Sequence, residues 1–583
     1  MILDRINGPK DLKTLNAAER KELAQEIRQA MLKRASIHGG HFGPDFGIVE
    51  ATIALHTVFD SPKDKIVWDV SHQVYPHKIL TGRKQAYLEE EHYDDVSGYS
   101  NPAESEHDFF EVGHTSTSIS LASGLAMARD LRGGHENIIA VIGDGSMSGG
   151  EALEGLDTVG EMGTNMIIVL NDNQMSIAEV HGGMYKGFEE LRRTGGKSEH
   201  NLFRAMGLDY RFVADGNDSE ALIKTFREVK DIDHPVVVHI VTQKGKGYKF
   251  AEENKESWHW HMPFDIETGE VKQPYVDEAA ELTATYLLDR LKTDKKLAIL
   301  TAATPASFGF TPERRKQAGK QFIDVGIAEE QAVAMASGLA KGGARPVFGD
   351  YATFFQRTYD QISQDVCINN NPAVFLVFGA SLYSMNDVTH LCIFDIPMMA
   401  NIPNLVYLAP VSLAEYKAML AWALDQTDHP VAIRVPVLPV SSEGRVIRTD
   451  YSQLNTYEVT RQGSDVAILG LGNFYGLAEQ TAAELEKKGI HATIINPTYI
   501  TGLDTDLLES LKKDHRLVVT MEDGVLDGGF GEKIARFYGD SEVKTYAFGL
   551  EKKFYDRYDY EKLAEKYNLK PELAAKKILD LIK

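Results

Sequence analysis

The side chains with the clearest chemistry are Asp144, in the run Gly143-Asp144-Gly145, and Asn173, in the run Asn171-Asp172-Asn173. A carboxylate oxygen and an amide oxygen are ligands that a hard cation such as Mg²⁺ accepts. The glycines would let backbone N–H groups approach phosphate oxygens. A Gly-Asp-Gly run alone is usually a turn, but the second oxygen ligand favours a binding site. We therefore predict a diphosphate clamp, formed by these two runs and closed by a divalent metal ion.

Each half of the clamp follows its own apolar run, Ile138 to Ile142 and Met166 to Leu170. Short, continuous apolar runs are typical of buried parallel strands. Sheets of this kind bind ligands beyond the carboxyl ends of their strands. We therefore expect both halves of the clamp at one edge of one sheet.

Strand and helix patterns alternate along the whole chain, which predicts an α/β fold of doubly wound domains with mainly parallel sheets. The chain opens with an amphipathic helix around Ala17 to Ser36, and a polar segment from 267 to 281 looks like a linker. A length of 583 residues suits three or four domains. We predict three domains, at residues 1–285, 290–440 and 450–583.

Composition narrows the class of protein. The chain has 62 Lys and Arg against 85 Asp and Glu, a net charge of −23, which argues against a general nucleic-acid or anionic-membrane surface. Its two cysteines, Cys367 and Cys392, are too few for a disulfide framework and are not spaced as a metal site. No leader pattern and no long apolar run occur. We expect a cytoplasmic protein.

The segment from Ala178 to His200 departs from the α/β rhythm, because it combines several glycines with many charges. It is predicted to be a loop or a short helical insert near the cofactor, where it could serve as a lid. A solvated surface excursion is the open alternative.

Three further runs extend the pattern beyond the clamp: Trp68 to Gln73, Tyr75 to Arg83 and Val112 to Ser120. With the clamp they resemble the 1-deoxy-D-xylulose 5-phosphate synthases, a branch of the transketolase-like thiamine enzymes, and the resemblance extends over almost the whole chain. It implies two cofactor-binding domains of the transketolase type, for diphosphate and pyrimidine, and a transketolase C-terminal domain. It also implies a homodimer that binds thiamine diphosphate and Mg²⁺.

The resemblance implies the ligands of this cofactor. It assigns the Asp144 and Asn173 side chains and the Met175 carbonyl to Mg²⁺, and Gly145 and Ser146 to the diphosphate. Further cofactor contacts are implied at His72, Gly113, His114, Thr115, Tyr248 and Phe354. In the family an aromatic ring at the last of these positions stacks on the aminopyrimidine, although without that context it would read as core.

Thiamine chemistry needs a carboxylate against N1′ of the aminopyrimidine, and the run Asp324 to Ala332 matches the family motif that supplies it. The resemblance gives this role to Glu329. By position alone, Glu329 and Glu330 could be a solvated helix start. Burial against a ring nitrogen would raise the pKa of the Glu329 carboxyl. The resemblance further implies catalytic proton transfer by three histidines: His41, His259 and His390.

The substrate side matches the family less well. Tyr351, Arg357, Asn386 and Arg434 fall at family substrate positions, the last as a phosphate-binding arginine. However, Gly379 replaces another phosphate-binding arginine, Asn386 replaces an aspartate, and Val437 lies where the usual Tyr-Pro-Arg-Gly ending has changed. Losing one bidentate guanidinium costs on the order of 1.5 to 3 kcal/mol. A changed acceptor is therefore a hypothesis that the sequence itself raises.

The implied reaction joins pyruvate to an aldehyde with loss of CO₂. With glyceraldehyde 3-phosphate, the family's acceptor, the product is 1-deoxy-D-xylulose 5-phosphate. Three alternatives stay open: a transketolase-like paralogue that passes a two-carbon unit to another aldehyde, a non-catalytic cofactor-binding subunit, and an acyl-transferring dehydrogenase component. Intact Glu329, Asp144 and Asn173 argue against the non-catalytic subunit.

Overall fold

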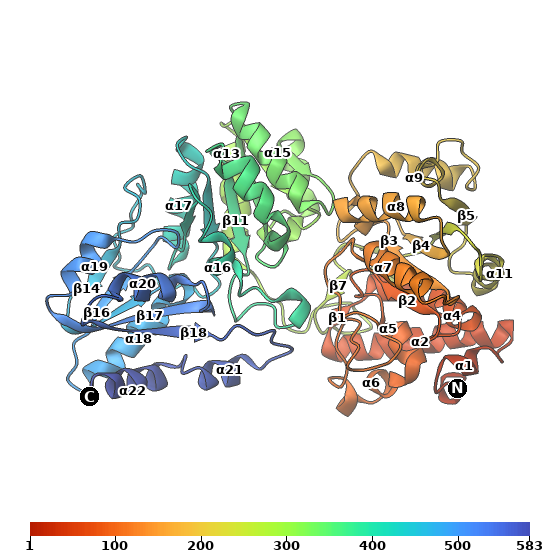
Figure 1. Ribbon diagram of the computed structural model, residues 1–583, viewed down its shortest axis with the longest axis horizontal. Helices are drawn as coiled ribbons and strands as arrows, with labels where there is room; N and C mark the ends of the chain where they lie inside the picture. The colour runs from red at the N-terminus through yellow and green to blue at the C-terminus, as the bar shows by residue number, and fades with distance from the viewer. The chain divides into compact units, whose positions relative to one another are not determined.

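The computed structural model describes residues 1–583 and divides into two compact units (Figure 1). The first comprises Met1–Tyr275 with Gly326–Ala328, and the second comprises Val276–Val325 with Glu329–Lys583. The predicted α/β class is confirmed, because the sheets are mainly parallel and helices alternate with the strands. None of the helices is both long and apolar enough to cross a membrane.

The first unit is built on a five-stranded parallel sheet. In spatial order its strands are β2 (Lys65–Trp68), β3 (Ile138–Gly143), β4 (Met166–Asp172), β6 (Pro235–Val241) and β5 (Asp209–Val213). The predicted strands at 138–142 and 166–170 are confirmed within β3 and β4, whose apolar residues are fully buried. A short antiparallel pair, β1 (Gly40–His41) and β7 (Trp260–His261), stands apart from the sheet.

Helices cover both faces of this sheet, as a doubly wound fold requires (Figure 1). One face packs against α4 (Val49–Val58) and α11 (Ser219–Val229), and the other against α7 (Ser118–Leu131) and α8 (Gly150–Met162). The other helical segments of the unit are η1 (Leu3–Arg5), α1 (Pro9–Leu12), α2 (Ala17–His38), α3 (Gly43–Gly47), α5 (Tyr75–Lys78), η2 (Ile79–Arg83), α6 (Gln85–Leu88), η3 (Glu90–His92), η4 (Gly145–Ser148), α9 (Met184–Arg193), α10 (Leu202–Ala205) and α12 (Lys249–Glu253).

The predicted helix at 17–36 is confirmed as α2, and its sequence explains where it starts. The Asn16 side chain accepts hydrogen bonds from the N–H groups of Ala18 and Glu19, while the Glu19 carboxylate accepts one from Asn16 N. This reciprocal capping box satisfies N–H groups that a helix start otherwise leaves without partners.

The second unit contains two sheets. The first is six-stranded and parallel, in the order β12 (Val406–Leu408), β13 (Val431–Arg434), β11 (Val374–Phe378), β10 (Arg345–Tyr351), β8 (Leu297–Thr301), β9 (Phe322–Asp324). Its helical segments are α13 (Glu278–Leu291), η5 (Pro305–Phe308), α14 (Pro312–Ala318), η6 (Gly319–Gln321), α15 (Glu329–Lys341), η7 (Phe354–Thr358), η8 (Gln361–Cys367), η9 (Val388–His390), α16 (Asp395–Met399) and α17 (Leu413–Asp425).

The C-terminal sheet has five strands, of which only the edge strand β14 is antiparallel. Their order is β14 (Glu458–Arg461), β16 (Thr493–Asn496), β15 (Asp465–Gly470), β17 (His515–Val525), β18 (Lys544–Leu550). The helical segments here are η10 (Gly472–Phe474), α18 (Tyr475–Glu486), α19 (Thr505–Leu511), α20 (Phe530–Tyr538), α21 (Tyr560–Lys566) and α22 (Pro571–Leu581).

Each large sheet falls inside one of the three predicted domains, at 1–285, 290–440 and 450–583. The first compact unit nevertheless ends at Tyr275, because α13 packs its alanines and leucines against the core of the second unit. The domain boundaries themselves stay predictions.

Candidate active site

The clamp in the first unit centres on Asp144, which directly follows β3 and caps η4. Its N–H donates to Asn171 O at 3.1 Å, which ties the ends of β3 and β4 together. The side chain is 1% exposed, and neither carboxylate oxygen has a hydrogen-bond partner. Burial and the Asp172 carboxylate raise the pKa of the Asp144 carboxyl to about 8, although the N–H groups of Asn173 and Gln174 oppose this rise. A buried carboxylate without partners fits a cation ligand.

The other half of the clamp turns sharply after β4. Gln174 has a φ of +65°, and Asn173 Oδ1 accepts a hydrogen bond from Met175 N at 3.1 Å. Gly145 approaches this turn closely: a Cβ there would lie 2.8 Å from Ser176 Cβ and 3.6 Å from Met175 O. The structure therefore brings the predicted metal ligands to one place, and Gly145 must be glycine for them to meet.

A second loop, which carries Gly113, His114 and Thr115, is fixed next to the clamp. The buried Asp69 carboxylate accepts hydrogen bonds from Ser116 N at 2.8 Å and Ser118 N at 3.0 Å. Ser116 Oγ donates to Ser146 O, also at 2.8 Å. The predicted diphosphate residue Ser146 and this predicted cofactor loop thus share a hydrogen bond.

Three of the predicted histidines form one cluster. The ring centroids of His41 and His72 are 5.0 Å apart, those of His72 and His259 are 5.1 Å apart, and those of His41 and His259 are 5.8 Å apart. Burial lowers the pKa of His41 and of His259 well below the usual value. Both imidazoles are therefore neutral near pH 7 and can each exchange a proton.

Lys244 joins the clamp and the histidines, and sequence reasoning missed it as a site residue. It is 1% exposed, and its Nζ donates to Ser176 O at 2.6 Å. Burial lowers the pKa of Lys244 to about 7, against the opposing effect of Asp144. The sequence does not indicate which polar residue of the run Lys244 to Tyr248 is buried.

Tyr248, predicted to contact the cofactor, is packed in an aromatic core. Its ring lies against Phe42, Trp258 and Phe264, and its hydroxyl donates to Ile266 O at 2.9 Å. Tyr248 is 7% exposed, and its contact with the cofactor stays a prediction.

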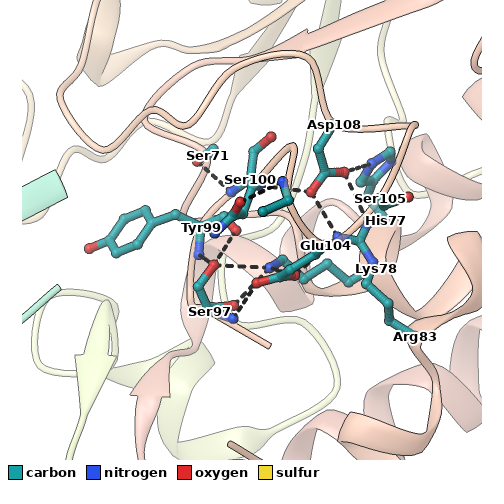
Figure 2. A network of polar contacts seen from close by, with 12 residues as sticks. Ser71, His77, Lys78, Arg83, Ser97, Tyr99, Ser100, Glu104, Ser105 and Asp108 are labelled. Carbon is teal, nitrogen blue, oxygen red and sulfur yellow. Dashed lines mark hydrogen bonds and ion pairs between the residues drawn. The ribbon is translucent and has the colours of Figure 1, made fainter. Parts of the chain in front are cut away.

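A buried polar network supports the run that carries His72 (Figure 2). Asp108 accepts hydrogen bonds from Arg83 at 2.7 and 2.9 Å, and its Oδ1 lies 2.9 Å from His77 Nε2. Ser100 N donates to Ser71 Oγ at 2.9 Å. The bond from Ser100 fixes the side chain of Ser71, whose φ of +63° is a backbone conformation that a serine adopts only at a cost.

The segment 178–200 contains the helix α9, which confirms the predicted short helical insert near the clamp. Phe188 and Leu191 are buried, while Tyr185 donates its hydroxyl to Asp144 O at 2.9 Å and Arg192 donates to Asp172 at 2.5 Å. A role as a lid stays a prediction.

In the second unit, Glu329 opens α15 and is 3% exposed. Its Oε2 lies 3.8 Å from Arg357 Nη1. Burial raises the pKa of the Glu329 carboxyl to about 7, against the effect of Arg357. Asp350, a second buried carboxyl that sequence reasoning missed, has its pKa raised well above the usual value by burial and by Glu329. A carboxyl with a pKa near neutrality can hold or release a proton at working pH.

Three of the predicted site residues in the second unit have aromatic rings that lie in contact. The ring of Phe354 is 6.2 Å from that of Tyr351 and 5.8 Å from that of His390, both edge to face. Thr389 Oγ1 lies 2.9 Å from His390 Nδ1 and fixes the imidazole orientation. This cluster presents one apolar ring between two groups that can form hydrogen bonds.

The ion pairs of Arg434 argue against its predicted role in binding substrate phosphate. Its guanidinium is 1% exposed and lies between two fully buried carboxylates, those of Asp395 and Asp523. Its Nε donates to Asp395 at 2.8 Å. Because all three nitrogens of its guanidinium donate to these carboxylates, Arg434 joins β13 to α16 and to β17 of the C-terminal sheet. The sequence could not show this, since both partners lie far away along the chain.

The comparisons with known proteins agree with one another. The profile described as 1-deoxy-D-xylulose-5-phosphate synthase matches residues 3–198 and 194–242, the transketolase pyrimidine binding domain matches 280–440, and the transketolase C-terminal domain matches 455–572. The 1-deoxy-D-xylulose-5-phosphate synthase of Clostridium beijerinckii is 36% identical over 622 residues, covering 100% of this chain and 99% of that protein. That of Carboxydothermus hydrogenoformans is 39% identical over 594 residues, covering 94% of each.

Among solved structures, transketolase from Leishmania mexicana is 16% identical, covers 97% of both chains and gives a TM-score of 0.43. A split-gene transketolase in an inactive tetramer is 23% identical, covers 52% of this chain and 98% of its own, and gives a TM-score of 0.46.

Proposed function

Because the chain belongs to the 1-deoxy-D-xylulose-5-phosphate synthase family, we propose that it condenses pyruvate with glyceraldehyde 3-phosphate to give 1-deoxy-D-xylulose 5-phosphate and CO₂. It is a transferase of the transketolase type, and its family depends on thiamine diphosphate. The observation that carries the proposal is Asp144, whose two buried oxygens lack partners where the clamp would hold a metal-bound diphosphate.

Within the clamp, Asp144, Asn173 and the Met175 carbonyl would hold Mg²⁺, and Gly145 and Ser146 would hold the diphosphate. When bound, thiamine diphosphate supplies the carbon nucleophile and the electron sink for loss of CO₂. The protein contributes the binding, the orientation and the exclusion of water. Lys244 adds a buried positive charge beside Asp144.

Glu329 would share a proton with N1′ of the aminopyrimidine. A pKa of about 7 suits this task, because the carboxyl is neither fully ionised nor fully protonated at neutral pH. Phe354 would stack on the same ring. Their shared surroundings with Tyr351 and His390 support one functional cluster.

The neutral imidazoles of His41 and His259, together with His72, would orient the substrate and move protons to or from its oxygens. The pKa values of His41 and His259 lie below the usual range because both imidazoles are buried. Neutral rings donate at one nitrogen and accept at the other, as proton transfer requires.

A specific observation favours a second candidate, transfer to an aldehyde other than glyceraldehyde 3-phosphate. Arg434 is paired with two carboxylates, Arg357 lies near Glu329, and Gly379 and Val437 offer no charge. A longer side chain at position 379 would be strained, since Gly379 has a φ of +66° and its Cβ would lie 2.8 Å from Ser384 Oγ and 3.2 Å from Tyr351 Cδ1. An acceptor with a small, uncharged end fits such surroundings better than a phosphate does.

A homodimer is also part of the proposal. On α7, Met127 and Leu131 are 47% and 81% exposed, and Gly124 and Ala128 lie exposed on the same turns. An apolar helix face of this kind suits contact with a second copy of the chain. Sedimentation at micromolar protein would test it: we expect a dimer, and replacing Leu131 with Glu should weaken it.

The product assay is the direct test of the reaction. Pyruvate labelled with ¹³C, thiamine diphosphate and Mg²⁺ are incubated with glyceraldehyde 3-phosphate, or with unphosphorylated aldehydes such as glyceraldehyde. We expect labelled 1-deoxy-D-xylulose 5-phosphate, with a raised acceptor KM. Product only from unphosphorylated aldehydes would establish the second candidate, and no CO₂ with any acceptor would contradict both.

A further inference from the structure

The loop from Gly379 to Ile393, here named the acceptor loop, is fastened at both ends to the C-terminal domain. At its start, Asn473 Nδ2 donates to Ala380 O at 3.1 Å. At its end, Val525 N donates to Ile393 O at 3.0 Å. The position of the acceptor loop is therefore fixed by the C-terminal domain as well as by β11, the strand that precedes it.

The middle of the acceptor loop is held by the segment Asp556–Tyr560, here named the C-terminal strap. The Tyr558 hydroxyl donates to Leu382 O at 2.7 Å, and the Tyr560 hydroxyl donates to Ser384 O at 2.6 Å. Three further hydrogen bonds join the two segments: Arg557 N to Asn386 O at 2.7 Å, Asn386 Nδ2 to Tyr558 O at 3.0 Å, and Val388 N to Asp556 Oδ1 at 3.3 Å.

The rings of the strap add to this contact. Tyr560 lies 6.0 Å from Tyr383 between ring centroids, and Tyr558 lies 5.5 Å from Tyr560. The rings of Tyr558 and Tyr560 are half-buried. The hydrogen bonds and the ring contacts of the strap together hold the acceptor loop in one conformation.

The acceptor loop also contacts the cluster of Tyr351, Phe354 and His390, so its conformation affects the position of these residues. Ser384, whose carbonyl accepts the Tyr560 hydroxyl, lies next to Gly379, which in turn is close to Tyr351. Asn386 is held by its side chain and by its backbone. His390, four residues further along, contacts Phe354. A shift of the loop would therefore move the predicted substrate residue Asn386 and the predicted catalytic residue His390 together.

We propose that Tyr558 and Tyr560 are positioning residues for the aldehyde acceptor. Their hydroxyls fix the acceptor loop in the conformation that presents Asn386 and His390, so the C-terminal domain takes part in acceptor selection without touching the reacting atoms. This inference rests on the proposed function, because it takes the loop as the acceptor side of the site. It predicts an effect on the acceptor and none on pyruvate.

Kinetics with Tyr558→Phe, Tyr560→Phe and the double variant provide the first test, because each change removes one hydroxyl and keeps the ring. Tyr567→Phe is the matched control, since its hydroxyl lies 3.0 Å from that of Tyr555 and 3.1 Å from Glu551. We expect the acceptor KM, for whichever aldehyde the full-length enzyme uses, to rise about threefold to tenfold per lost hydroxyl. The KM for pyruvate should stay unchanged, and so should the control. An unchanged acceptor KM, or an equal rise for pyruvate, would overturn the proposal.

Hydrogen–deuterium exchange of the same proteins gives a readout that needs no turnover. Peptides covering 379–393 should exchange at least about threefold faster in the two strap variants than in the wild type or in Tyr567→Phe. Unchanged exchange would refute the strap's role even in an active enzyme. Faster exchange in a protein that never consumes pyruvate would instead support the strap and contradict the proposed reaction.

Discussion

Asp144 and Arg434 show how burial decides what a charged side chain can do. Asp144 is buried without a hydrogen-bond partner for either oxygen, whereas Arg434 is buried between Asp395 and Asp523. A buried charge is costly unless something compensates it. The charge of Arg434 is compensated by two carboxylates of the protein, so its guanidinium is a poor ligand for a substrate phosphate. The charge of Asp144 has no such partner in the protein, and a bound cation would compensate it.

Replacing Asp144 with Asn should therefore abolish the metal-dependent part of cofactor binding. Removing one partner of a buried charge pair costs roughly 3 kcal/mol, which corresponds to about 100-fold in affinity. Calorimetric titration of thiamine diphosphate in the presence of Mg²⁺ measures it. Asp157→Asn, an exposed change on α8, is the control and should bind as the wild type does. Equal affinity in both variants would remove Asp144 from the metal site.

Replacing Arg434 with Met should damage stability, not acceptor binding. It leaves two buried carboxylates without their cation, which costs about 3 to 5 kcal/mol in the free energy of unfolding. Urea titration followed by circular dichroism measures this loss, with the exposed Arg516→Met as control. A stable Arg434→Met protein with a strongly raised KM for a phosphorylated acceptor would restore Arg434 as a substrate residue.

At the scale of elements, the apolar runs predicted β3 and β4 because a buried parallel strand needs little besides uninterrupted side chains. The start of α2 could be predicted equally well, since Asn16 and Glu19 cap it locally. The contact between the C-terminal strap and the acceptor loop could not be predicted from the sequence. It joins residues more than 160 positions apart, and it does so through backbone oxygens that no side-chain pattern marks.

The surroundings of single site residues could not be predicted from the sequence either. The family motif placed Glu329 and the clamp, but the aromatic packing of Tyr248 and the burial of Lys244 depend on neighbours from several elements. A motif states which residue types recur. It does not state which of them face the site.

The junction of β17 and α20 predicts a pH dependence of stability. Burial raises the pKa of Glu522 to about 7, although its carboxylate accepts hydrogen bonds from Phe530 N and Gly531 N. Since the folded pKa exceeds the unfolded value of about 4.3, the folded state binds the extra proton. The stability that this proton gives is complete below pH 4.3 and is lost as the pH rises through 7.

Glu522→Gln should therefore gain stability relative to the wild type as the pH rises from 5 to 8, by up to about 3 kcal/mol. Unfolding midpoints in urea at several pH values measure the difference. The exposed Glu542→Gln provides the comparison and should show no such trend. A constant difference across this pH range would mean that Glu522 is ionised in the folded protein throughout.

At the scale of the whole molecule, the functions predicted for the chain are divided between the two units. The metal and diphosphate residues with the histidine cluster belong to the first, and Glu329, the aromatic cluster and the acceptor loop belong to the second. The second unit also holds the departures from the family, at Gly379, Asn386 and Val437. Metal and diphosphate binding and the choice of acceptor therefore rest on residues of different units, so they need separate tests.

We propose above all that this chain uses thiamine diphosphate and that Glu329 is the carboxyl that shares a proton with it. The most direct measurement is thiamine-dependent CO₂ release from pyruvate, with a saturating aldehyde, by the wild type and by Glu329→Gln. We predict release by the wild type and a fall of about 100-fold or more in the variant, with thiamine diphosphate still bound by both. No thiamine-dependent CO₂ from the wild type, or full activity in Glu329→Gln, would contradict the account.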